Sequence, residues 1–120
     1  MIKSQSHIAA PVPQPIMDRA AQLIHRVRYD QPASQHVDLM YEVIMDMTVS
    51  GMEFYFMEPL RRVNAGSMTM KIAQMGLSST QKGIRMVIRK VLHRLTEEQL
   101  VAITGFIEEI LFEAEEAKAA

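Results

Sequence analysis

The sequence predicts an all-α protein, a small antiparallel bundle of about five helices that associates into an oligomer. Two observations indicate this class. Apolar residues recur at helical spacing through most of the chain, and no stretch alternates polar and apolar residues for long enough to indicate a sheet. The expected helices span 16–29, 34–58, 67–75, 79–95 and 97–117.

The first expected helix is supported by apolar residues at helical spacing. Ala20, Leu23 and Val27 share one face of the segment 16–29. Pro32 follows shortly after, and proline disfavours continuation because it has no N–H and its ring clashes with the preceding turn. The first helix is therefore expected to end near residue 29.

The second expected helix, 34–58, begins at Ser34, which is a favourable N-cap residue. Pro59 is expected to stop it. Gly51 would weaken an exposed helix by about 1 kcal/mol relative to alanine. Its presence indicates close backbone packing or a bend at that point.

The last three expected helices are separated by turn and capping residues. Gly76 is expected to end the third helix in a left-handed C-terminal position, with Ser78 or Ser79 capping the fourth. Thr96 and Gln99 match a capping box for the fifth. The fourth carries the clearest apolar stripe, formed by Ile84, Val87, Ile88, Val91, Leu92 and Leu95.

The 120 residues fit a single helical domain, 16–120, preceded by a flexible proline-containing tail, 1–15. The absence of cysteine excludes disulfide bonds and thiolate metal sites. The N-terminus has no apolar core of the kind that signal peptides carry, and no uncharged run reaches 18 residues. We therefore expect no membrane span and a cytoplasmic location.

The second and fifth expected helices carry apolar residues on several faces. In so small a domain one neighbouring helix cannot cover them, so a homo-oligomer, with a dimer favoured, or a complex with another protein is expected. The eleven methionines suit an adaptable binding surface. The expected interface residues are Leu39, Val43, Met52, Phe56, Val101, Phe106 and Phe112.

Charge is segregated along the chain into acidic, basic and acidic blocks, although the net charge is only −1. Segment 30–59 has six acidic residues and no Lys or Arg, and segment 60–95 has eight basic residues and no acidic one. From residue 96 onward there are seven glutamates and one lysine. The favoured interpretation is that the basic segment lies against its acidic neighbours, within one chain or between subunits, and fixes their register.

The alternative interpretation of the basic block is a phosphate-binding surface for nucleic acid or an acidic membrane face. The absence of aromatic residues from segment 57–105, on which bases could stack, counts against it. Segment 71–80 resembles a helix-turn-helix only superficially, and an ordinary capped turn between two helices is favoured. The residues of this candidate surface are Arg61, Arg62, Lys82, Arg85, Arg89 and Arg94.

No catalytic signature is present. Asp38, Glu42 and Asp46 lie along one helical line, but the Glu-x-x-His spacing of a di-metal site is missing. No phosphate loop, dinucleotide fingerprint or nucleophile elbow occurs. We therefore expect no metal, no cofactor and no enzymatic activity.

The preferred function is a non-catalytic interaction or regulatory protein that binds a copy of itself or a partner protein through its Met- and Phe-rich helix faces. One alternative is a nucleic-acid-binding protein, similar to a transcription regulator, that uses the basic segment 61–94. Another is a binder of an apolar small molecule. Its pocket would be lined by Met47, Phe54, Phe56 and Phe106.

Overall fold

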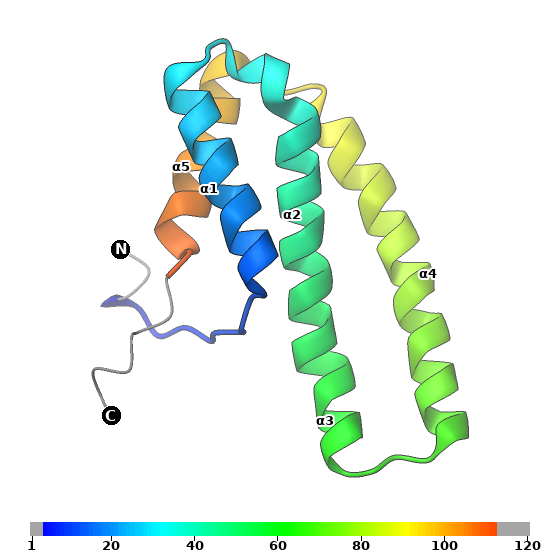
Figure 1. Cartoon of the computed structure of the whole chain (residues 1–120). Helices are drawn as coiled ribbons and strands as arrows, with labels where there is room; N and C mark the ends of the chain where they lie inside the picture. The colour runs from blue at the N-terminus through cyan, green and yellow to red at the C-terminus, as the bar shows by residue number, and fades with distance from the viewer. Residues whose placement is uncertain (1–3, 113–120) are drawn as a thin grey trace.

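The computed structural model describes residues 4–112, which contain helices and no β-strand (Figure 1). The α-helices are α1 (Gln14–Tyr29), α2 (Val37–Met52), α3 (Glu58–Arg62), α4 (Ser67–Leu92) and α5 (Glu97–Ile110), with a 3₁₀ turn η2 (Ala33–His36) and a π-helical segment η3 (Glu53–Met57). The elements α2, η3 and α3 follow one another without a break and form one long rod, residues 37–62 (Figure 1). The all-helical class is confirmed. With the rod counted as one helix, the described residues form four helices in place of the five predicted.

Helix α4 runs unbroken through Gly76, so the predicted end at residue 75 and the predicted serine cap at residues 78–79 are wrong. No glycine between residues 4 and 112 has a positive φ, and Gly76 is therefore not in the left-handed C-terminal conformation. Leu77, the next residue, is buried against the rod side of the helix. Burial of such side chains offsets the helix-weakening effect of glycine, about 1 kcal/mol.

The rod also continues past Pro59, which was predicted to stop it. The preceding turn is π-helical: the backbone N–H of Glu58 donates to the carbonyl of Glu53, five residues earlier. This wider turn lets Pro59 occupy the first turn of α3, where a missing N–H costs least. The rod ends at Arg62 instead of residue 58.

Thr96 forms the predicted capping box of α5. Its hydroxyl accepts from the Gln99 backbone N–H at 3.2 Å, and the Gln99 side chain accepts from the Thr96 N–H at 2.9 Å. Helix α5 ends at Ile110, and Leu111 is extended. The predicted continuation through Leu111 and Phe112 is wrong, and residues 113–117 lie outside the described part.

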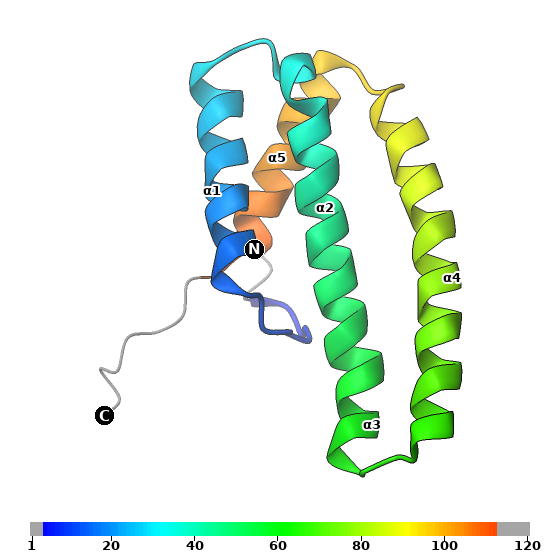
Figure 2. The same cartoon turned by 45° about the vertical axis from the view of Figure 1, so that its right-hand side comes forward.

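Helices α1 and α5 pack together with the N-terminal half of the rod (Figures 1 and 2). Figure 2 shows α4 running antiparallel beside the rod, joined to it by residues 63–66. One buried cluster joins these elements and involves both the start and the later part of α5. Its members are Ala20, Leu23, Val27, Ala33, Val37, Met40, Val43, Leu92, Leu100 and Ile107.

The other half of the rod and the facing half of α4 extend beyond α1 and α5 as a two-helix hairpin (Figures 1 and 2). Met57 and Leu77 are buried there, yet neither belongs to the main cluster. Two helices bury one stripe of each other and leave their remaining faces open. The hairpin, defined as residues 45–85, is therefore covered on fewer sides than the rest of the protein.

Candidate interaction surface

An apolar groove of about 690 Å³ lies between the rod and α4 in the hairpin. The rod contributes one wall and α4 the other, and none of the lining residues carries a charge. The lining residues are Gly51, Met52, Tyr55, Phe56, Ile72, Ala73, Gly76, Leu77 and Thr80.

The small residues of the groove leave it open. A Cβ atom built on Gly51 or Gly76 would meet nothing within 4 Å. Of the two explanations offered for Gly51, close packing or a bend, close packing is therefore absent from the single chain. Instead, the glycines leave the backbone of both walls accessible to an incoming group.

The apolar surface continues from the groove around the outward side of α4. At 100° per residue, its exposed apolar residues fall within an arc of about 160°, roughly opposite the face that packs on the rod. Met75 is 70% exposed and Ile72 is 64% exposed. We define the apolar arc as Met68, Ile72, Met75, Gly76, Gly83, Met86, Val87 and Val91.

The predicted interface residues separate into three groups. Val43 is fully buried in the main cluster and Leu39 packs against that cluster, so neither lies in the groove. Met52 and Phe56 both line the groove, where Phe56 is 50% exposed. The remaining three lie on α5 or just after it and are partly exposed: Val101, Phe106 and Phe112.

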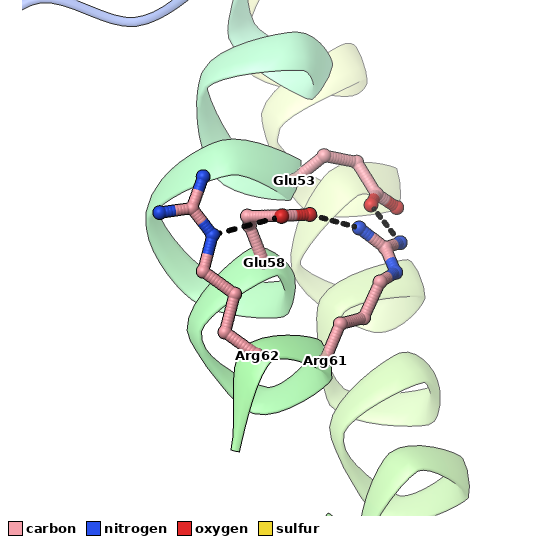
Figure 3. A network of polar contacts seen from close by, with 4 residues as sticks. All are labelled: Glu53, Glu58, Arg61 and Arg62. Carbon is pink, nitrogen blue, oxygen red and sulfur yellow. Dashed lines mark hydrogen bonds and ion pairs between the residues drawn. The ribbon is translucent and has the colours of Figure 1, made fainter. Parts of the chain in front are cut away.

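Two of the predicted phosphate-binding residues are engaged by carboxylates of the rod (Figure 3). Arg61 contacts Glu53 at 2.7 Å and Glu58 at 3.2 Å, and Arg62 contacts Glu58 at 3.0 Å. Hydrogen bonds from Arg62 and Arg61 lower the pKa of the Glu58 carboxyl, and those to Glu53 and Glu58 raise the pKa of Arg61. Both arginines are thus held in an exposed ion-pair network at the end of the rod.

The cations of α4 lie on a separate strip beside its apolar arc. Arg89 places its guanidinium carbon 4.2 Å from the centre of the Tyr41 ring, a cation–π contact with the rod. Within residues 4–112 no Lys or Arg of α4 forms an ion pair. We define the basic strip as Lys71, Lys82, Arg85 and Arg89; Arg94, which follows the helix, is exposed as well.

Arg85 shows how the charge blocks meet within one chain. It lines a shallow depression together with Asp46 and Glu53, on the side of the rod away from the groove. Asp46 nevertheless pairs with Arg19 of α1, and Glu53 pairs with Arg61. The basic α4 thus lies beside the acidic rod, but none of its cations forms an ion pair there, so charge pairing that fixes the register stays a prediction.

The four residues predicted to line a pocket for an apolar ligand lie in different parts of the structure. Phe56 lines the groove, while Phe54 lines a depression beside Pro11 and Arg61. Met47 packs against the main cluster, and Phe106 is exposed on α5. The groove exceeds the roughly 300 Å³ that a small-molecule site requires, but only Phe56 of the predicted lining belongs to it.

The residues of α4 that form one wall of the groove were not predicted from the sequence. Placing a helix end at Gly76 put Ile72 and Thr80 on different elements, so their common face was not seen. The available signal was the spacing of Ile72, Gly76, Thr80 and Gly83, which repeats every three or four residues.

No known protein family matches the chain, and no curated protein or solved structure shows a significant similarity to it. None of the helices between residues 4 and 112 combines the length and hydrophobicity needed to cross a membrane. The same described residues hold no group of three or more His, Asp or Glu side chains placed to bind a metal ion.

Proposed function

We propose that the protein is a non-catalytic interaction protein that self-associates through the apolar face of the hairpin. The observation that supports it most is the groove together with the apolar arc of α4, which form one continuous, predominantly apolar surface on a two-helix layer. Contiguous apolar patches of this kind on soluble proteins mark interaction sites.

The extent of the surface agrees with this proposal. Eight large apolar side chains of the hairpin and the adjoining α4 are between 45% and 70% exposed: Tyr55, Phe56, Met68, Ile72, Met75, Met86, Val87 and Val91. At this exposure each presents about 100 Å². Together they present roughly 800 Å², the area that one partner contributes to a standard-size interface.

The residue types on this surface are also typical of protein interfaces. Methionine has a flexible, polarisable side chain that adapts to irregular partners, and aromatic residues are enriched at interface centres. Tyr55 and Phe56 stand at the groove edge, and three methionines lie on the arc. The proposed interface thus keeps Met52 and Phe56 of the rod and adds residues of α4 in place of those on α5.

A charge placed in this surface is expected to disrupt self-association. Because Ile72 is 64% exposed, Ile72→Glu should leave the fold intact while adding a carboxylate that the interface would have to desolvate. We expect the dissociation constant to rise at least tenfold in sedimentation velocity. The matched control is Ile8→Glu, the same change at an 81% exposed residue of the N-terminal segment. Equal effects of the two substitutions, or none from Ile72→Glu, would count against the proposal.

A second candidate function, nucleic-acid binding, is favoured by the basic strip, whose cations have no carboxylate partner in the described structure. If it holds, a fluorescent DNA duplex should bind at low salt and be released log-linearly as salt rises. Arg85→Ala should then reduce the salt slope by about one. Arg62→Ala removes a cation already held by Glu58 and should change the slope less. A DNA affinity that changes neither with salt concentration nor with Arg85→Ala would exclude this function.

A further inference from the structure

Six of the eight residues of the apolar arc are distributed symmetrically about the point between Ser79 and Thr80, and the other two, Met75 and Met86, are not. Three pairs lie equally far from that point along the sequence: Gly76 with Gly83, Ile72 with Val87, and Met68 with Val91. All six belong to the apolar arc, on the side of α4 that no other described element covers.

Such a pattern of apolar residues is the same when it is read from either end of the helix. When a helix is laid antiparallel on a copy of itself with these centres aligned, residues equidistant from the centre come to the same level along the pair, and those near the middle of the arc meet across the contact. In a two-fold interface, if residue i of one copy contacts residue j of the other, then j of the first also contacts i of the second. Gly76 would then oppose Gly83 of the second copy, Ile72 would lie level with its Val87, and Met68 and Val91 would lie at the two edges of the contact.

We propose that the occupant of the apolar arc is the α4 helix of a second copy of this chain, packed antiparallel around a two-fold axis beside Ser79 and Thr80. This inference rests on the self-association proposed above and adds its geometry. Large side chains lie at both ends of the contact and glycines at its centre, so the two backbones can approach closely there.

The groove fits the same arrangement. Because Ile72 is one of its lining residues, the register places Val87 of the second copy at its mouth, beside Phe56. The two-fold axis repeats this contact at the other end of α4. The uncharged lining suits a valine and leaves no carboxylate or ammonium group to desolvate.

The charges of α4 lie beside this contact. The basic strips of the two copies come to the same side of the dimer, where the cations are solvent-exposed. At physiological salt such charges are screened beyond about 8 Å, and their repulsion is small beside the burial of a standard-size apolar interface. Lys90, within the arc, would oppose the uncharged Thr69 of the second copy.

Single cysteines introduced into this cysteine-free chain test the register. Ser79 lies next to the proposed axis, so Ser79→Cys should form a disulfide between copies under mild oxidation at 0.15 M salt, because bridged Cα atoms are usually about 4.4–6.8 Å apart. Ser78→Cys is the matched control, since a 100° turn places it toward the basic strip. We expect the linked dimer to be the main product for Ser79→Cys and a minor one for Ser78→Cys.

The possible outcomes separate the two proposals. A wild-type chain that remains monomeric would overturn both. A dimeric wild type in which Ser79→Cys does not link, or links no better than Ser78→Cys, would overturn the antiparallel α4 contact and leave self-association standing.

Glycine-to-alanine substitutions give a second readout that needs no cysteine. A methyl group at either Gly76 or Gly105 meets nothing within 4 Å in the single chain, so both variants should fold. If the α4 helices approach closely, Gly76→Ala should raise the dimer dissociation constant about tenfold, and Gly105→Ala should leave it unchanged. An unchanged constant for Gly76→Ala would contradict the close approach.

Discussion

Replacing Leu23 with alanine is expected to lower the free energy of unfolding by about 3 kcal/mol. Leu23 has no exposed surface and sits in the cluster that joins α1, the rod, α4 and α5. The substitution removes apolar burial and leaves a cavity that neighbouring helices fill only in part. Urea denaturation followed by circular dichroism measures the change.

The control for this experiment is Ile8→Ala, at an exposed residue outside the cluster. Surface substitutions of that kind usually stay within about 0.5 kcal/mol. A Leu23→Ala variant that loses less than about 1 kcal/mol would show that the cluster is not the structural centre of the protein.

Replacing Glu97 with alanine is expected to cost about 2 kcal/mol, the second largest effect. Its carboxylate accepts hydrogen bonds from the backbone N–H groups of Ala33 and Ser34, the latter at 3.1 Å, and so joins the start of α5 to the start of η2. Ala33 is fully buried, and without the carboxylate its N–H has no partner in this arrangement. Hydrogen bonds to ionised acceptors are stronger than neutral ones.

Glu98 provides the matched control for Glu97. Both glutamates lie in the first turn of α5 and interact favourably with the helix dipole, worth about 0.3–1 kcal/mol. Glu98→Ala removes that contribution alone, whereas Glu97→Ala also removes the two hydrogen bonds. Equal losses in urea denaturation would show that the contacts to Ala33 and Ser34 contribute nothing.

Periodicity and local capping predicted part of the fold correctly. Leu23 and Val27 were placed on the buried face of the first helix, and the Thr96 capping box marked the start of α5. These features depend on residues three or four positions apart, and they are therefore visible in one sequence.

The errors arose where contacts outside the local sequence decide the structure. Glycine is common just past the end of a helix, so Gly76 indicated an end, whereas the burial of the next residue, Leu77, favours a continuous helix. Pro59 is accommodated by a π-helical turn, and no residue before Pro59 predicts that turn. Joining 67–75 to 79–95 into one helix is what creates the α4 wall of the groove.

The candidate surface could be predicted only in outline. The sequence shows an excess of apolar residues on the second helix, but not that Val43 points into the core while Phe56 borders the groove. It shows eight basic residues in one block, but not that Glu53 and Glu58 engage Arg61 and Arg62. Both distinctions depend on how the rod packs and how far it extends.

Sedimentation equilibrium of the wild-type chain over a range of concentrations tests the central claim most directly. If the apolar face of the hairpin and α4 drives self-association, the mean mass should rise from 13.6 kDa toward twice that value within the micromolar range. A mass that stays at the monomer value up to several hundred micromolar would contradict the claim.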